Sequence, residues 1–293
     1  MKKLSIIAML FMVSLGIVAH SRAEQEGEMM PRAYLPVVLV PEAFACADTS
    51  TNSYVGGTAN QHDADDPVRF AYAHADKNIA LRGYAPNTDT SLVRDLIDYG
   101  SGDPTQPPQF ATLFSPYRVP TFADFHRVNG WNWASSPNPG TRGDAIPFPA
   151  VTAVSFPLPP DEPLHVPTSG YDIGSGAEVI VIFADENTVT LHYTREDTSA
   201  VGYTIHIDNI CTDPALLALY ESLDDENGPR YDYPSSGYNL PALPAGKMIG
   251  TTGMGDMVVA ITDTGAFQDT RSCNDWWQIR PGYTGSCPSA LLK

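Results

Sequence analysis

The chain has few basic residues: 17 Lys and Arg stand against 34 Asp and Glu, a formal net charge of −17. So acidic a chain is repelled by phosphate backbones and by anionic lipid headgroups, which argues against a nucleic-acid or membrane-surface role. Acidic clusters suit calcium, but the clusters at residues 62–66 and 224–226 lack the glycine and the regular Asp/Asn spacing of a calcium loop. We interpret them as solvated acidic turns.

Long apolar runs are confined to the N-terminus. Lys2 and Lys3 precede the run LSIIAMLFMVSLGIVA, and Ser21-Arg22-Ala23 places small residues where a signal peptidase reads them. No second apolar segment long enough to cross a bilayer follows. We therefore expect residues 1–23 to be a signal peptide cleaved near Ala23. The mature chain, with a formal charge of −20, is then secreted, extracellular or periplasmic, with no membrane insertion.

Cysteine is scarce, with Cys46, Cys211, Cys273 and Cys287 in the whole chain. An even number in an exported protein indicates disulfides, and four cysteines allow three connectivities. Cys273 and Cys287 are the nearest pair, and closing so short a loop would contribute about 3 kcal/mol. Cys46 would then pair with Cys211. No two cysteines have the close spacing of a zinc knuckle.

Familiar catalytic motifs are also missing. The chain contains neither a Gly-x-Ser-x-Gly elbow nor a phosphate-binding loop, which argues against a serine hydrolase and a nucleotide-binding enzyme. A glycosidase needs only two facing carboxylates, and Asp197 and Asp263 are candidates. Asp263, however, lies in Thr-Asp-Thr-Gly, which is typical of a structural turn.

The pattern of the remaining chain predicts a mainly β protein with antiparallel sheets in two packed lobes and one or two short helices. Residues 24–42 form a polar tail and a leading strand at 34–40. Residues 43–167, rich in Pro, Asn, Asp and aromatics, predict an irregular β-rich lobe with a helix at 91–99. Residues 168–293 predict a second β lobe. Its strands are expected at 177–183, 248–252 and 257–263, with a turn at Asn187 and a helix beginning at Asp213-Pro214.

The stretch VTLHYTREDTSAVGYTIHID, residues 189–208, predicts a hairpin in this second lobe. Its alternation places Tyr203, Ile205 and Ile207 on an apolar face and His192 and His206 on a polar one. Folding back about Ser199 would set the two histidines opposite each other, with Cβ atoms about 5 Å apart. They are candidates for a metal-binding or catalytic pair, and the simpler interpretation is a solvated polar face.

The C-terminal lobe resembles the β core of the lysostaphin-type zinc metallopeptidases, which cut peptide cross-bridges in bacterial cell walls. The resemblance covers roughly 100 residues. It is carried by Tyr203-Thr-Ile-His206, Gly246-Lys-Met-Ile-Gly250, Gly253-Met-Gly255, the strand Asp256-Met-Val-Val-Ala-Ile261 and Gly265-Ala-Phe-Gln-Asp269. It implies a β-sheet domain with a zinc-dependent peptidase as its ancestral activity.

The departures from the family bear on that activity. The family's zinc ligands come from a His-x-x-x-Asp motif and from a His-x-His strand, and the strand at residues 256–261, where His-x-His should stand, contains no histidine. Of the motif histidines only His206 remains. His192 would be a second ligand, and His126, His165 or a carboxylate a third, whereas a catalytic zinc needs three protein ligands and an open position. We therefore expect a degenerate domain without a metal cofactor, with zinc or calcium as the alternative.

Two pairs of tryptophans are the candidate ligand-binding residues. Trp131 and Trp133 flank Asn132, and Trp276 and Trp277 follow Asn274-Asp275. Sugar rings stack on exposed aromatic faces while nearby amides and carboxylates bind the hydroxyls, although tryptophans in such positions are also common in cores.

Three functions remain open from the sequence. The first is a secreted, non-catalytic protein that binds peptidoglycan or another extracellular glycan. The second is a metal-dependent cell-wall hydrolase centred on His192 and His206. The third is a purely structural protein of a surface assembly.

Overall fold

The computed structural model describes residues 45–60, 70–87, 107–135, 138–227 and 238–277. All of them belong to one of the two units into which the chain divides, residues 43–293. The expected signal peptide, the strand at 34–40, the helix at 91–99 and Cys287 lie outside the described residues. Within the described ranges, no helix is long and apolar enough to span a membrane.

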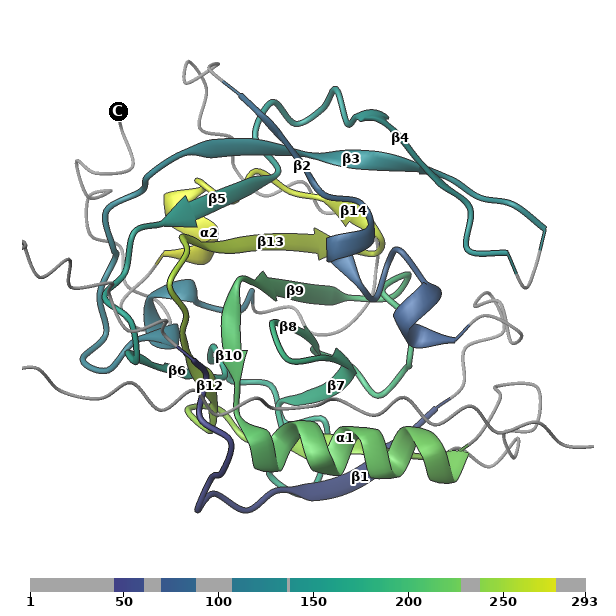
Figure 1. The fold of residues 1–293 in the computed structure, drawn as a ribbon, viewed down its shortest axis with the longest axis vertical. Helices are drawn as coiled ribbons and strands as arrows, with labels where there is room; N and C mark the ends of the chain where they lie inside the picture. Colours follow the sequence, from purple (N-terminus) through teal and green to yellow (C-terminus); the bar gives the residue numbers. More distant parts are fainter. Residues whose placement is uncertain (1–44, 61–69, 88–106, 136–137, 228–237, 278–293) are drawn as a thin grey trace, which may run out of the picture. The chain divides into compact units, whose positions relative to one another are not determined.

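The structure is mainly β and its strand pairs are antiparallel, which confirms the predicted fold class (Figure 1). The larger sheet has eleven strands and the smaller has three. In order across the larger sheet they are β1 (Val55–Ala59), β11 (Tyr238–Leu243), β7 (Val179–Ala184), β8 (Thr188–His192), β9 (Tyr203–Asp208), β13 (Met257–Asp263), β5 (Ala153–Phe156), β3 (Phe125–Asn132) and β2 (Tyr84–Pro86), with β14 (Ala266–Phe267) beside β13 and β4 (Thr141–Ala145) beside β3. The smaller sheet contains β10 (Ile210–Thr212), β12 (Met248–Thr252) and β6 (Pro163–His165).

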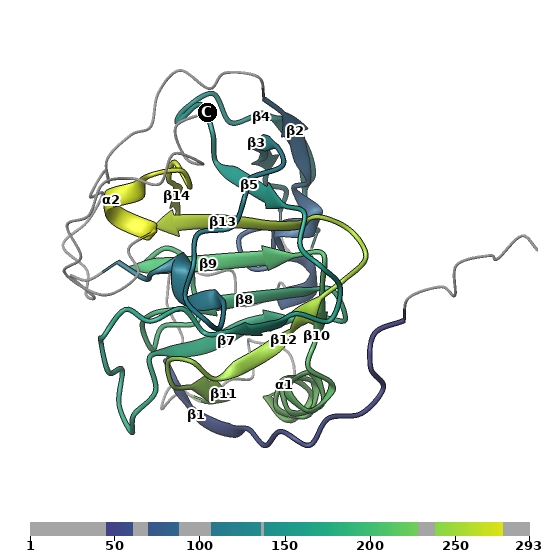
Figure 2. The ribbon, with the colours of Figure 1, turned by 90° about the vertical axis from the view of Figure 1, so that its left-hand side faces the viewer.

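The two segments expected as separate lobes share the larger sheet. Strands of residues 168–293 form the run β11-β7-β8-β9-β13, and strands of residues 43–167 flank it on both sides. β1 pairs with β11, and β5 pairs with β13 (Figure 2). The expected boundary near residue 167 therefore does not coincide with a break in the sheet.

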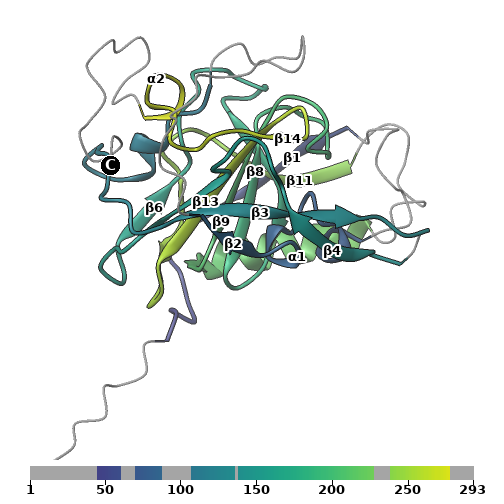
Figure 3. The same ribbon diagram turned by 90° about the horizontal axis from the view of Figure 1, so that it is seen from above.

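Both faces of the central strands are covered, so β7, β8 and β9 are buried along their whole length. The helix α1 (Pro214–Asn227) and the 3₁₀ helices η1 (Ala71–Ala73) and η2 (Ile79–Leu81) contact one face. The 3₁₀ helix η3 (Phe110–Leu113) and α2 (Cys273–Trp276) lie on the other (Figure 3). The burial explains the continuous apolar sequence of β7, because a strand covered on both sides loses the apolar–polar alternation.

Helix α1 begins as the sequence predicts, with Asp213 as its N-cap. The amides of Ala215 and Leu216 donate to Asp213 Oδ1 at 2.9 and 3.4 Å. The other carboxylate oxygen accepts from Ser50 Oγ at 2.8 Å and from Asn52 Nδ2 at 2.6 Å. One carboxylate therefore starts the helix and anchors the segment that precedes β1.

We expect Asp213→Ala to lower the free energy of unfolding by about 2 kcal/mol, because it removes a helix cap together with side-chain hydrogen bonds. Asp213→Asn keeps one oxygen acceptor for the helix amides and is expected to cost less. Urea denaturation of both variants measures the difference, and equal losses would contradict the capping role.

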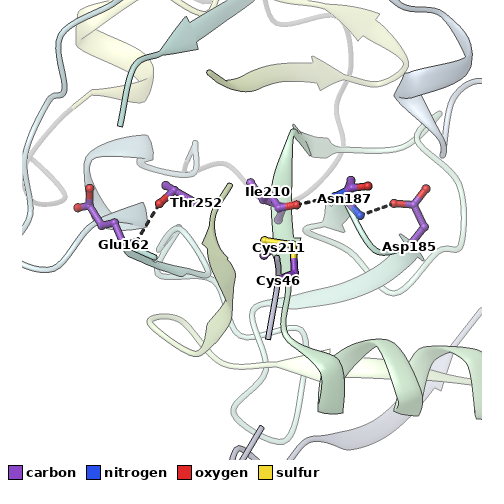
Figure 4. The surroundings of a disulfide bond; sticks show 7 residues. All are labelled: Cys46, Glu162, Asp185, Asn187, Ile210, Cys211 and Thr252. Atoms are coloured by element: carbon purple, nitrogen blue, oxygen red, sulfur yellow. Dashed lines mark hydrogen bonds between the residues drawn. A yellow bond between two sulfur atoms is a disulfide. The ribbon is translucent and has the colours of Figure 1, made fainter. Parts of the chain in front are cut away.

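The disulfide between Cys46 and Cys211 confirms one of the predicted pairings. The two Cα atoms are 5.3 Å apart, and the bond joins the N-terminal segment to β10 across 165 residues (Figure 4). Asn187, the predicted turn residue, donates from Nδ2 to the carbonyl of Ile210 at 3.1 Å. The amide of Asn187 donates in turn to Asp185 Oδ1 at 2.9 Å, so the turn before β8 is tied to β10.

Candidate functional site

The hairpin of β8 and β9 forms, and Tyr203, Ile205 and Ile207 are buried as predicted. The register differs from the expected one, because His206 pairs with Thr190 and His192 pairs with Thr204. The two histidines are therefore diagonal neighbours rather than opposite each other.

The connecting loop explains the changed register. Asn60, at the end of β1, donates its amide to the carbonyl of Arg195 at 2.7 Å and accepts from the amide of Asp197 at 3.0 Å. Part of the loop thus pairs with a strand far away in the sequence. The expected register, with a symmetric turn about Ser199, assumed that the loop forms hydrogen bonds only within the hairpin.

The face that carries the histidines is buried, which corrects the expectation of a solvated face. His192 and His206 are 0% and 2% exposed. His192 Nδ1 lies 2.9 Å from Thr204 Oγ1, and His192 Nε2 lies 2.6 Å from Thr194 Oγ1. His206 Nδ1 lies 3.3 Å from Thr190 Oγ1. Threonine hydroxyls thus satisfy ring nitrogens that the sequence interpretation assigned to water or a metal.

The segment that contains η1 and η2 supplies the cover over this polar layer. Thr190 Oγ1 donates to the carbonyl of Lys77 at 2.6 Å, and the side chain of Arg82 lies on the same face. Burial, together with the charges of Arg82 and His192, lowers the pKa of His206 to about 3. His206 is therefore neutral at physiological pH.

Within the ranges that the structure describes, no three His, Cys, Asp or Glu side chains gather in a way that could hold a metal ion. His126 Nε2 lies 3.2 Å from Ser155 Oγ, and His165 Nδ1 lies 3.3 Å from the carbonyl of Leu113. Neither histidine is brought to His192 and His206 as a third ligand.

Trp276 and Trp277 belong to the core, which corrects their assignment as ligand-binding residues. They are 0% and 2% exposed, and their indole N–H groups donate to the carbonyls of Asp269 and Thr270 at 3.0 and 2.7 Å. Both rings pack against other aromatic rings of the core, namely Phe110, Phe122, Phe156 and Tyr203. Their faces are not available to a ligand.

Trp131 and Trp133 lie at the surface, at the end of β3. The Trp133 side chain is 44% exposed, and its ring centroid is 6.3 Å from that of Trp131. Trp131 Nε1 donates to the carbonyl of Pro139 at 2.6 Å, which fixes its ring against the opposite arm of the hairpin. The β3–β4 hairpin extends away from the central strands in two perpendicular views (Figures 1 and 3).

The distant segment at residues 70–74 contacts this pair through His74. His74, just after η1, has its ring 4.9 Å from that of Trp133. Phe70 and Tyr72 stack on each other 5.4 Å apart, and they are 40% and 62% exposed. We name the five residues Phe70, Tyr72, His74, Trp131 and Trp133 the aromatic patch. Polar groups border it, since Asn132 and Asn138 are exposed.

The sequence analysis missed the part of the patch at residues 70–74. The signal is the spacing in Phe70-Ala-Tyr72-Ala-His74, where every second residue is aromatic. Residues 71–73 form the 3₁₀ helix η1, and in it the rings of Phe70 and Tyr72 stack on each other. Nothing local indicates that the segment meets β3.

A hollow lies between β1, β11 and the loop at residues 173–177, with a volume of about 460 Å³. Glycine backbone and the side chain of Arg195 make up much of its wall, and no carboxylate lines it. Neither the histidine pair nor the aromatic patch lines this hollow. It offers no pair of groups for acid–base catalysis.

Comparisons with protein families, with curated proteins and with solved structures return no match to this chain.

Proposed function

We propose that this is a secreted, non-catalytic protein that binds cell-wall or other extracellular polysaccharide through the aromatic patch. The observation that carries the proposal is a group of rings from two distant segments. Trp133, Phe70 and Tyr72 are exposed, Trp133 packs against Trp131 and the buried His74, and Phe70 stacks on Tyr72. Packed rings are held rigid, so binding a sugar costs little side-chain entropy.

The chemistry of the patch fits a glycan. The C–H faces of sugar rings stack on exposed aromatic faces, and amides such as that of Asn132 bind hydroxyls. The excess of acidic residues disfavours polyanions, so neutral polysaccharides are the better ligands. The disulfide supports an oxidising, extracellular location.

The test is binding of the mature chain to insoluble peptidoglycan, chitin and cellulose, measured by depletion from solution. We expect Trp133→Ala and Tyr72→Ala each to weaken binding about tenfold, which corresponds to about 1.4 kcal/mol. Tyr117→Ala is the matched control, because Tyr117 is 54% exposed and does not belong to the patch. Its affinity should equal that of the unaltered chain.

Three results would overturn the proposal. Binding that both patch variants leave unchanged would place the ligand elsewhere. Release of soluble fragments from peptidoglycan would favour the metal-dependent cell-wall hydrolase. Self-association without affinity for any glycan would favour a structural protein of a surface assembly.

A further inference from the structure

A lysine and an aspartate are sealed together beneath the segment that covers the polar layer. Lys77 Nζ lies 3.4 Å from Asp197 Oδ2, and both side chains are 0% exposed. Tyr238, from β11, donates its hydroxyl to the same carboxylate oxygen. Lys77 lies between η1 and η2 and Asp197 in the loop between β8 and β9, 120 residues apart.

The distance between Lys77 Nζ and Asp197 Oδ2 is long for an ion pair, but it keeps an amine and a carboxyl group in contact, as a reaction between them requires. Charge-assisted N–H···O contacts are typically about 2.7–2.9 Å, and the separation here is larger. Taking an ammonium and a carboxylate out of water costs several kcal/mol per ion, so transfer of one proton to give an amine and a carboxylic acid relieves the cost. A neutral amine is a nucleophile, and a carboxylic acid is an electrophile.

We propose that Lys77 and Asp197 condense into an intramolecular isopeptide bond. The lone pair of Lys77 Nζ attacks Cγ of the protonated Asp197 carboxyl group and forms a C–N bond. The C–O bond to one carboxyl oxygen then breaks, and this oxygen leaves as water with the carboxyl proton and one proton from the amine. The products are an amide and one water molecule, so no oxidant or co-reactant is needed.

The fold holds both reactants in place before they react. The amide of Lys77 donates to the carbonyl of His74 at 2.9 Å, and its carbonyl accepts from Thr190 Oγ1. The amide of Asp197 is bonded to the carbonyl of Asn60. Reacting groups that a fold holds in contact react as if at very high effective concentration. Tyr238 bonds to a reacting oxygen and polarises the carboxyl group, so it is the catalytic residue of this step.

A second buried ion pair shows why the lysine matters. Arg271 and Asp269 are 1% and 2% exposed at their side chains and lie 2.7 Å apart. A guanidinium stays protonated and offers no free amine lone pair, so this pair cannot condense. The two pairs are equally buried and differ in their nucleophile.

The test is peptide mass mapping of the mature chain after reduction, alkylation and trypsin digestion. An isopeptide bond blocks cleavage after Lys77. We expect a branched product that joins residues 70–82 to residues 196–230, lighter than the sum of its two parts by one water molecule. Recovery of separate peptides 70–77 and 78–82, with 196–230 unlinked, would overturn the proposal.

Three variants test the chemistry. Asp197→Asn should give the same branched product, because an amide carbon attacked by the lysine releases ammonia in place of water. Lys77→Arg keeps the positive charge and should give no branched product. Tyr238→Phe should slow the appearance of the product after refolding, and an unchanged rate would remove Tyr238 from the step. Peptide mapping of the unaltered chain is sufficient to test the proposal, even if a variant fails to fold.

Discussion

Replacing Asp269 with alanine is expected to lower the free energy of unfolding by about 3–5 kcal/mol, because it removes the carboxylate that pairs with a buried guanidinium. Arg271 Nε donates to Asp269 Oδ1 at 2.9 Å and Nη2 donates to Oδ2 at 2.7 Å. The amide of Arg271 also donates to Oδ1, at 3.0 Å. An arginine cannot neutralise itself by losing a proton, so the cost stays in the folded state.

The measurement is the free energy of unfolding from urea titration at fixed pH. The control is Arg118→Met, which removes the ion pair of Arg118 with Glu162 together with the guanidinium that lies over the Phe114 ring. The Arg118 side chain is 35% exposed, so this loss should stay below about 1 kcal/mol. If Asp269→Ala cost no more than the control, the buried pair would not have the role that its burial implies.

Stability is expected to fall steeply with decreasing pH below about 6.5, and His206 is one cause. Its pKa is about 3 in the folded chain, against 6.5 for an unperturbed histidine. Between these two values the unfolded chain binds a proton at this residue and the folded chain does not. The contribution is therefore complete above pH 6.5 and is lost as pH falls toward 3, at about 1.4 kcal/mol per pH unit.

Urea titrations at pH 7.5, 5.5 and 4.5 measure this slope. Carboxylates titrate in the same range, so the informative quantity is the difference between the unaltered chain and His206→Gln, which keeps a polar side chain without a titrating proton. We expect the variant to lose less stability between pH 7.5 and 4.5, by about 2–3 kcal/mol. Parallel pH profiles for the two proteins would contradict the burial of a neutral His206.

Features that depend on neighbouring residues were predictable from the sequence. The cap at Asp213 needs only the residues that follow it, and the apolar face of β9 follows from the alternation of Tyr203, Ile205 and Ile207. The pairing of Cys46 with Cys211 was predicted because the two cysteines nearest in the sequence, Cys273 and Cys287, were paired first, which left Cys46 and Cys211.

Features that depend on distant segments were not predictable. Alternation divides β8 and β9 into two faces, but it does not show that residues 70–83 fold over the polar one. His192 and His206 can be buried because threonine hydroxyls in the same layer form hydrogen bonds with their ring nitrogens. In the sequence, a buried face of His and Thr has the same polar pattern as a face exposed to solvent. Trp133 was found as a candidate, whereas its partner His74 comes from a segment more than 50 residues earlier.

The strand order also determines when the sheet can be completed as the chain folds. β1 has no partner until β11 is available, and β5, β3 and β2 join the sheet only through β13, near the end of the chain. The block β11-β7-β8-β9-β13 is contiguous in sequence from residue 179 onward, so it can assemble first and then offer two open edges to the earlier strands. Pairings over such long separations slow folding, and open edges invite association with other chains. The N-terminal strands are therefore expected to join the sheet late in folding, β1 by pairing with β11 and β5 by pairing with β13.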